Sequence, residues 1–437
     1  MTDLSEAGRP SNSARRVLFA SLIGTTIEFF DFYIYATASV IVFPKLFFPT
    51  SDPTSAVLQS FATFSIAFFA RPFGAALFGH FGDRIGRKAT LVAALMTMGL
   101  STIAIGLLPT YASVGVLAPL LLALCRFGQG LGLGGEWGGA VLLATENAPP
   151  GKRAWYGMFP QLGAPIGFIC SNGGFLLMAE TLTDAQFLDW GWRIPFIASS
   201  ILVVVGLWVR LRLTETPDFR RAIEREERVR VPIAKVFATH KALLLYGTIG
   251  AVATFVLFYI MTVFALNWGT TALGYTKANF LPLQLIGVTF FGLTIPLSAL
   301  AADRFGYVRT LIWTTAAMIV FGLLLGPIFG SGTTVGVLVF LIGGFALMGF
   351  TYGPLGTALA EPFPVAVRYT GASLAFNLAG ILGASLAPYA ATMLATTWGL
   401  GAVGWYLAIA SALTLIALVA MNRGDDRDAV YVPDEVV

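Results

Sequence analysis

Long apolar runs separated by short polar segments follow one another from residue 17 almost to the end of the chain. A membrane-spanning helix needs about 20 mostly apolar residues at a rise of about 1.5 Å each. The strands of an outer-membrane barrel instead alternate in polarity over about 10 residues, so the runs exclude that fold. The pattern predicts an all-α membrane protein with twelve transmembrane helices, in the runs 17–42, 56–79, 89–109, 116–144, 154–179, 192–212, 242–266, 280–301, 310–329, 335–358, 369–393 and 402–421.

The distribution of charge agrees with this layout. Charged residues make up 11% of the chain and hydrophobic residues 57%, whereas a soluble domain carries about 25% charged residues. If the N-terminus is cytoplasmic, 22 of the 27 Lys and Arg lie on the inside, three on the outside and two within spans. The positive-inside rule therefore predicts that both termini are cytoplasmic. A bundle this apolar is expected to have the lipid bilayer as its partner and to bind no nucleic acid.

Two motifs recur with an offset of a little over 200 residues. The sequence DRIG at 83–86, after the second run, recurs as DRFG at 303–306 after the eighth. Glu146 and Arg153 follow the fourth run as Glu361 and Arg368 follow the tenth. Paired repeats are typical of transporters built from two halves. We therefore predict an N-terminal six-helix bundle over 1–212, a cytoplasmic linker over 213–241, and a C-terminal six-helix bundle with a cytoplasmic tail over 242–437.

The segment GHFGDRIGRK at 79–88 resembles the signature loop of the major facilitator superfamily. Within that superfamily the chain resembles the metabolite:proton symporters. The resemblance covers nearly the whole chain, and it is carried by EFFDFYIY at 28–35, ARPFG at 70–74, RFGQG at 126–130, GGEWGG at 134–139, WGWRIPF at 190–196 and ETP at 215–217.

This resemblance implies two pseudo-symmetric six-helix bundles in a bacterial inner membrane, in a chain that acts as a monomer. Known members carry α-ketoglutarate, shikimate, or proline and betaine. The function expected is therefore proton-coupled symport, that is, uptake of a small polar metabolite, an organic acid or a zwitterion, by alternating access. The proton is the coupling ion, with Na⁺ as the open alternative, and no other cofactor is expected.

Two other functions stay open at this point. One is a proton-driven exporter of drugs or metabolites, which would share the fold. The other is an intramembrane enzyme or a receptor, but no catalytic constellation is visible in the sequence. His80 and His240 are isolated, so no metal site is expected.

Five ionisable residues lie within predicted spans, all in the N-terminal half: Glu28, Asp31, Arg71, Arg126 and Glu136. Each costs about 2.5–3.5 kcal/mol at the centre of a membrane helix, so each is a candidate functional residue. Desolvation raises the pKa of a carboxyl group and a nearby Arg lowers it. The proposed proton site is Asp31 with Arg126 as its modulator, and a direct pair between them is feasible from their depths.

Other roles for these five residues remain open. Glu28, Arg71 and Glu136 are predicted to form a second network of the coupling machinery. A guanidinium matches a carboxylate bidentately, so Arg126 or Arg71 is a candidate for binding a substrate carboxylate. The structural alternative is that all five form neutral buried pairs that hold the bundle together.

Three further residues are predicted to contact the substrate. Tyr35 shares a helix face with Glu28 and Asp31, at spacings i, i+3 and i+7. Tyr352 precedes a Gly-Pro pair that should bend its span, and Asn377 is polar in mid-span. The alternative for each is packing within the bundle.

Charged residues at the cytoplasmic helix ends are implied by the resemblance to form ion pairs that close the cytoplasmic side, although their charge alone would also set the topology. They are Asp83, Arg84, Arg87, Lys88, Glu146, Arg153, Asp303, Arg304, Glu361 and Arg368. Separately, Gly130, Gly134 and Gly138 have the small-xxx-small spacing that lets two membrane helices approach closely.

Overall fold

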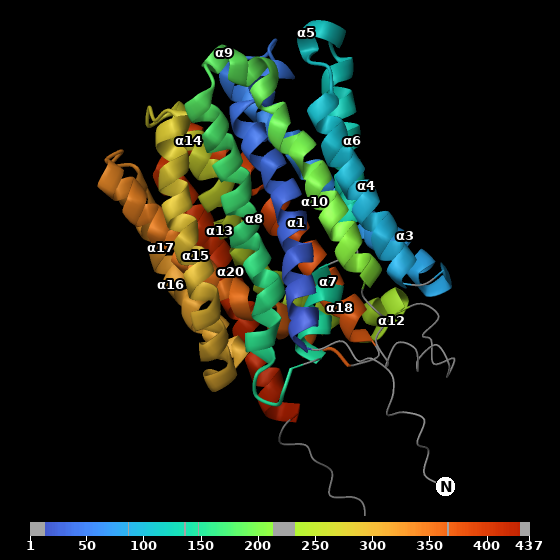
Figure 1. The fold of residues 1–437 in the computed structure, drawn as a ribbon. Coiled ribbons are helices and arrows are strands. Elements are labelled where there is room, and N and C mark those ends of the chain that lie inside the picture. The colour runs from blue at the N-terminus through green and yellow to red at the C-terminus, as the bar shows by residue number, and fades with distance from the viewer. Residues whose placement is uncertain are drawn as a thin grey trace, which may run out of the picture.

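The computed structural model describes the backbone of residues 14–85, 87–134, 137–146, 148–212, 232–364 and 367–428. Within these ranges the chain is helical almost throughout and contains no strand (Figure 1). The α-helices and π-helices (η) are α1 (Ala14–Ile41), α2 (Phe43–Leu46), α3 (Pro53–Ile85), α4 (Arg87–Leu107), α5 (Tyr111–Val114), α6 (Leu117–Leu133), α7 (Trp137–Glu146), α8 (Arg153–Thr181), α9 (Asp184–Gln186), η1 (Phe187–Gly191), α10 (Arg193–Arg212), α12 (Pro232–Thr239), α13 (Lys241–Tyr259), η2 (Ile260–Phe264), α14 (Ala265–Thr271), α15 (Lys277–Phe305), α16 (Tyr307–Phe329), α17 (Thr334–Ala360), α18 (Arg368–Ala379), η4 (Gly380–Ser385), α19 (Ala387–Trp398) and α20 (Leu400–Asp428).

The predicted spans correspond to these helices. Among the described residues, nine helices are long and apolar enough to cross a membrane, a tenth span is bent by 42° between η1 and α10, and two shorter apolar helices lie in α4 and α6. Each predicted run is occupied by helix, with the fourth divided between α6 and α7. The prediction of a twelve-helix, all-α membrane protein is confirmed. The predicted linker lies outside the described residues up to its last helix, α12.

Two spans are interrupted in a way that hydropathy did not predict. The seventh span runs from α13 through η2 into α14, and the eleventh runs from α18 through η4 into α19. A π-helix turn frees backbone carbonyls from the regular ladder and is frequent at functional sites. Gln284 of α15 donates from its amide to the carbonyls of Met261 and Thr262, at 3.0 and 2.9 Å, so freed groups of η2 find a partner.

Helices from both halves of the chain lie side by side in one bundle (Figure 1). Within the N-terminal half α1 packs along α8 and α3 along α6, and within the C-terminal half α15 packs along α17 and α16 along α20. The long helices α8 and α15 also pack against each other. Contacts between the two predicted halves therefore run along the full height of the bundle.

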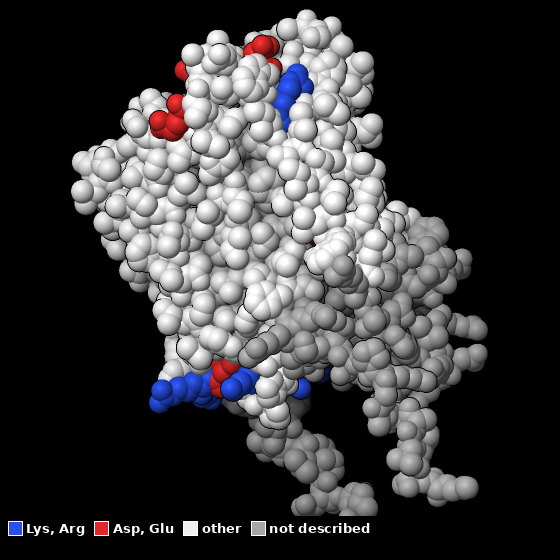
Figure 2. Space-filling view, viewed as in Figure 1, with Lys and Arg blue, Asp and Glu red and all other residues white. Residues whose placement is uncertain are grey.

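The outer surface of the bundle is apolar. Leu293, Leu297 and Leu300 of α15 are exposed by 59%, 54% and 54%, and many other large hydrophobic side chains on outer helices are exposed as well. On the face drawn in Figure 2, charged side chains gather at the two ends, with hardly any between them. Extended apolar surface of this kind requires an apolar surrounding, which fits a multi-pass membrane protein.

Glycines bring α3 and α6 into close contact. A Cβ atom on Gly130 would lie 2.4 Å from the carbonyl oxygen of Ala67, and one on Gly134 would lie 2.0 Å from that of Arg71. On the facing helix, a Cβ on Gly74 would lie 2.0 Å from the carbonyl oxygen of Leu131. The predicted close approach is confirmed for Gly130 and Gly134, whereas the surroundings of Gly138 lie outside what the structure describes.

Gly130→Ala is expected to destabilise the protein by about 1–3 kcal/mol, because the added methyl group meets backbone and overpacks the interface. The matched control is Gly173→Ala in α8, where an added Cβ has nothing within 4 Å and Ala favours the helix by about 1 kcal/mol. Thermal unfolding of the purified variants in detergent should show a lower melting temperature for the first variant only. Equal melting temperatures would contradict the close packing.

Candidate functional site

The carboxyl group of Asp31 lies at the head of a buried chain of hydrogen bonds. Asp31 of α1 is 1% exposed. It accepts hydrogen bonds from Ser199 Oγ of α10 at 2.5 Å and from Thr102 Oγ1 of α4 at 3.2 Å. Thr102 Oγ1 accepts from Gln129 Nε2 at 2.8 Å, and Gln129 Oε1 accepts from Arg126 Nη1 at 3.0 Å. Four helices of the N-terminal half therefore meet in one polar relay.

This relay replaces the direct Asp31–Arg126 pair that the depths of the two residues allowed. Asp31 forms no ion pair with any residue that the structure describes. The spacing of Gln129 three residues after Arg126 places both on one face of α6, so the amide reaches the guanidinium first. Sequence reasoning missed Thr102, Gln129 and Ser199 because neutral side chains carry no signal in a charge count.

The guanidinium of Arg126 is held by aromatic rings. Its Cζ lies 4.0 Å from the ring centre of Tyr35, 4.5 Å from that of Phe32 and 4.7 Å from that of Phe64. Nε also donates to the carbonyl of Phe64 at 3.3 Å, and the residue is 0% exposed. Cation–π contacts gain strength when the cation is desolvated. They help to explain how this cation is kept in an apolar bundle, where it forms no ion pair with a described carboxylate.

Tyr35 belongs to the same buried cluster. It is fully buried, and its hydroxyl donates to Thr63 Oγ1 of α3 at 2.9 Å. The structure therefore places Tyr35 inside the N-terminal half beneath Arg126, and its predicted contact with substrate is not tested by this geometry.

Arg71 and Glu28, predicted to belong to a second network, lie near each other between the halves. Both line a small pocket of about 10 Å³ with Asn377 of α18. The remaining lining residues are Leu133, Gly134, Ser373 and Phe376. Arg71 also lies over the rings of Phe68 and Phe32, at 4.7 and 5.1 Å. Glu136, the third predicted member of this network, lies outside the described residues.

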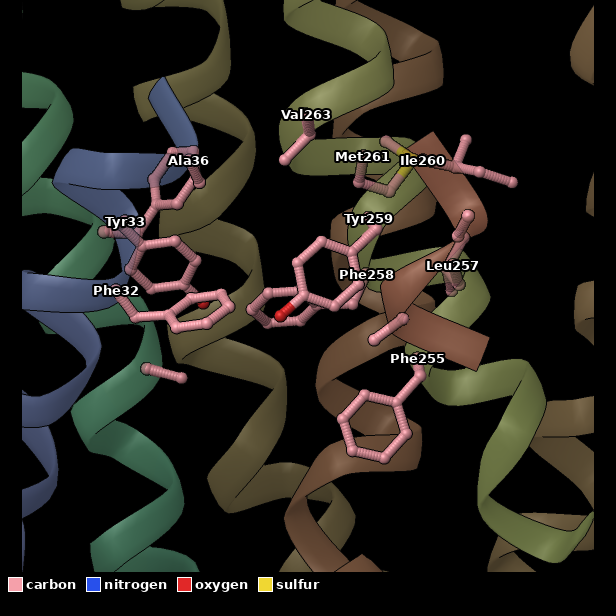
Figure 3. Packing of buried hydrophobic residues seen from close by; sticks show 14 of the residues in the cluster. Phe32, Tyr33, Ala36, Phe255, Leu257, Phe258, Tyr259, Ile260, Met261 and Val263 are labelled. Atoms are coloured by element: carbon pink, nitrogen blue, oxygen red, sulfur yellow. The ribbon is translucent and has the colours of Figure 1, made fainter. Parts of the chain in front are cut away.

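Aromatic rings from both halves fill the centre of the molecule. Phe32 and Tyr33 of α1 face Phe258 and Tyr259 of α13 (Figure 3). Ring centres of Tyr33 and Phe258 are 5.6 Å apart, and those of Phe32 and Tyr259 are 6.2 Å apart. Tyr352 of α17 joins them, 6.4 Å from Phe258. Of the predicted substrate contacts, Tyr352 and Asn377 thus lie where the two halves meet.

The end of the bundle predicted to be cytoplasmic is closed by contacts between the halves. Arg153 at the start of α8 forms an ion pair with Glu361 at 2.6 Å. Asp303 of α15 accepts hydrogen bonds from the backbone N–H groups of Ala154 and Trp155, at 2.9 and 3.0 Å. These amides belong to the first turn of α8, which lacks partners within the helix and attracts negative charge.

The other predicted gating residues are placed differently or not described. Arg368 donates from Nε to the carbonyl of Phe363 at 3.1 Å, and Arg304 lies 5.2 Å from the ring of Phe305. Neither forms an ion pair with a described residue. The side chains of the remaining predicted gating residues lie outside what the structure describes, namely those of Asp83, Arg84, Arg87, Lys88 and Glu146.

The opposite end is closed by contacts that sequence reasoning did not identify. Lys277 at the start of α15 pairs with Asp184 of α9 at 2.8 Å, and its ammonium lies 4.2 Å from the ring centre of Phe187. Deeper in the bundle, Asn172 of α8 donates to Gln284 of α15 at 3.4 Å. The one available signal was that Lys277 is one of only three basic residues predicted on this side. Both ends of the molecule are therefore bridged between its halves.

Comparison with known proteins identifies the family to which this chain belongs. A family described as "Sugar (and other) transporter" matches residues 17–242. Over 419 residues the chain is 57% identical to the inner membrane metabolite transport protein YhjE of Escherichia coli (strain K12), covering 95% of each. The chain belongs to this transporter family, within the major facilitator superfamily. It is also 35% identical over 394 residues to the shikimate transporter of Escherichia coli (strain K12), covering 88% of each.

A solved structure shares the fold. The chain superposes on the major facilitator proton:xylose symporter XylE bound to 6-bromo-6-deoxy-D-glucose with a TM-score of 0.72, covering 94% of this chain and 95% of the other at 16% identity. The expected fold and family are confirmed by these comparisons. The protein is a membrane transporter of the metabolite and sugar type, and members of its family are transporters and not enzymes.

For this transporter, reversing the charge in the bridge at the start of α8 should weaken the closed arrangement. Arg153→Glu is expected to lower the melting temperature of the purified protein, because it replaces an attraction worth up to about 1 kcal/mol with a repulsion. The double variant Arg153→Glu with Glu361→Arg should recover most of the loss. Lys152→Glu, the same charge change one residue away, is the control. Failure of the double variant to recover stability would show that the two residues do not act as a pair.

Proposed function

We propose that the protein is a proton-coupled symporter that takes up a small polar metabolite, an organic acid or a zwitterion, by alternating access. One observation carries this proposal. The Asp31 carboxyl is fully buried, is contacted by hydroxyl groups, and forms no ion pair within the described chain. Asp31 is the proposed proton site, and Arg126 is the group that modulates it through Gln129 and Thr102.

The chemistry follows from the cost of charge inside the bundle. An ionised carboxylate without a counter-ion costs several kcal/mol in a low-dielectric interior. A proton removes that cost while the site is closed, and water offsets it once the site opens. Hydrogen bonds join Arg126 to Gln129, Gln129 to Thr102 and Thr102 to Asp31. A shift of the Arg126 guanidinium therefore changes the hydrogen bonding available to Asp31. Proton binding is thereby linked to the arrangement of the helices.

Alternating access needs a closure at each end that can open in turn. The Arg153–Glu361 pair and the Lys277–Asp184 pair join the halves at opposite ends, and each has one largely exposed side chain. Exposed ion pairs are worth about 1 kcal/mol or less, so either end can open at small cost. We propose the end with Arg153 as the cytoplasmic one, with both termini on that side and the bacterial inner membrane as the location.

The substrate class is supported by the relatives and by the central residues. The shikimate transporter is 35% identical to this chain, and shikimate is an organic acid. The resemblance to proline and betaine permeases supports a zwitterion instead. Both classes carry a carboxylate, which a guanidinium binds bidentately. Tyr352 and Asn377 are the proposed contacts from the C-terminal half, whereas Arg126 and Tyr35, which the sequence predicted as contacts, are enclosed within the N-terminal half. The chain is proposed to act as a monomer.

The alternative function is proton-driven export, which the fold alone does not distinguish from uptake. Whole cells that express the protein can be given a panel of radiolabelled carboxylates and zwitterions, shikimate and proline among them, with and without an uncoupler. A symporter accumulates its substrate, more at lower external pH, and the uncoupler abolishes the accumulation. An exporter gives the opposite result, because the uncoupler then raises the amount retained.

Asp31→Asn is expected to abolish accumulation, so that the internal substrate concentration no longer exceeds the external one, because the amide cannot carry the coupled proton. Exchange of labelled for unlabelled substrate should survive, since that reaction moves no net proton. Uptake into proteoliposomes with an imposed proton gradient measures the first, and counterflow measures the second.

The control is Asp52→Asn. Asp52 is exposed and accepts hydrogen bonds from the backbone N–H groups of Thr54 and Ser55 at 3.1 Å each, which Asn also does well at a helix start. Undiminished accumulation by the Asp31 variant would refute the assignment.

A further inference from the structure

Among the residues that the structure describes, the Arg71 guanidinium forms no hydrogen bond, although it lies in the centre of the molecule. Its Nε is shielded from solvent and forms no hydrogen bond. Arg71 also forms no ion pair with any described residue, and it makes cation–π contacts with the rings of Phe68 and Phe32. A shielded donor without an acceptor is costly, so Nε can take a further acceptor beyond the electrostatic effect of Glu28.

The pocket beside Arg71 gathers further donors from the opposite half. Ser373 and Asn377 lie four residues apart on α18, on one helix face, and both line the pocket. The Ser373 hydroxyl is shielded from solvent and has no hydrogen-bond partner, and Asn377 is 8% exposed. A guanidinium, a hydroxyl and an amide thus converge on one space. A carboxylate accepts hydrogen bonds from all three kinds of group.

Arg126 does not offer the same opportunity. It is fully buried, its Nη1 and Nε are hydrogen-bonded to Gln129 and to the Phe64 carbonyl, and three rings surround it, although its Nη2 also has no hydrogen-bond partner. It is also absent from the pocket lining. Of Arg126 and Arg71, only Arg71 lines this pocket between the halves.

We infer that Arg71, Ser373 and Asn377 form the subsite that binds the carboxylate of the transported metabolite, bridging the N-terminal and C-terminal halves. This inference rests on the proposed function and names the group that the substrate presents. The pocket has about 10 Å³ in the closed arrangement, room for about one water molecule. The body of the metabolite therefore occupies space that opens as the halves move apart, while its carboxylate remains at the subsite.

Glu28 gives this subsite a connection to the proton. It lines the same pocket and acts electrostatically on Arg71. Two carboxylates beside one guanidinium leave a negative charge without compensation. A proton that enters with the metabolite and binds Glu28 removes that excess, so the pocket is neutral when anion and proton are both absent or both present, and charged when either is present alone.

The test measures binding at equilibrium, without a proton gradient, so that it is independent of coupling. Purified protein in detergent is heated with hydroxylated monocarboxylates, keto dicarboxylates and zwitterions, each acid matched by its methyl ester. At least one carboxylate should raise the melting temperature of the wild type, because a bound ligand stabilises the folded state, and its ester should not. Stabilisation by the ester as strong as by the acid, or by no carboxylate in the panel, would overturn the inference.

Arg71→Gln is expected to weaken binding of that carboxylate on the order of 10- to 100-fold, because a charge-assisted hydrogen bond is lost. Its melting temperature without ligand should stay close to that of the wild type, since Glu28 can bind a proton once the neighbouring cation is removed. A merely structural Arg71 would give the opposite pattern, a lower melting temperature with unchanged affinity.

Ser373→Ala is the second variant, with an expected loss of affinity of about 3- to 10-fold for one neutral hydrogen bond. Ser411→Ala is its matched control. The Ser411 hydroxyl is also buried without a partner, but it lies on α20 away from the pocket. The Ser411→Ala variant should therefore bind the carboxylate with the affinity of the wild type. Equal affinity in the Ser373 and Ser411 variants would remove Ser373 from the subsite. If Arg71→Gln also binds normally while Asp31→Asn loses accumulation, the subsite is wrong and the proposed symport stands.

Discussion

The cost of leaving a polar group unsatisfied in an apolar surrounding governs this structure. Lipid offers no hydrogen bonds, so each buried donor or charge must find its partner within the bundle. Arg126 finds three rings, a carbonyl and Gln129, and Asp31 finds Ser199 and Thr102. These contacts join α1, α4, α6 and α10, which hold the relay in place. The same rule makes a group without a partner, such as Arg71 Nε, a sign of function.

The interactions between the halves differ in kind from those within the N-terminal half. The relay around Asp31 is fully shielded from water, where breaking a hydrogen-bonded network is costly. The bridges at the two ends are partly exposed, with side-chain exposures of 52% and 27% for Arg153 and Glu361, and such pairs contribute little. This contrast suits a transporter, whose halves must separate at one end and then at the other while each half keeps its internal contacts.

The centre of the molecule combines aromatic rings with cations. Phe32 lies within cation–π distance of both Arg71 and Arg126 and packs against Tyr259 of the other half. A movement between the halves therefore acts on a ring that contacts both guanidinium groups. Through the Phe32 ring, a movement of the C-terminal half can displace the Arg126 guanidinium, which is connected by hydrogen bonds to the proposed proton site at Asp31.

The sequence by itself determined the fold class and the identity of the charged residues. Twelve apolar runs of spanning length leave no other compact solution, because backbone in lipid must be helical, and Asp31 or Arg126 within a run is visible by its charge alone. The tertiary structure decided the partners. Gln129 rather than Asp31 receives the guanidinium of Arg126, Glu361 pairs with Arg153 across the two halves, and Ser373 lines one pocket with Arg71 from more than 300 residues away along the chain. Hydropathy indicates how deep a residue lies along its own helix, but not which neighbour its side chain faces. The direction of the side chain depends on the rotation of each helix about its axis, which is set by the packing of all the helices together.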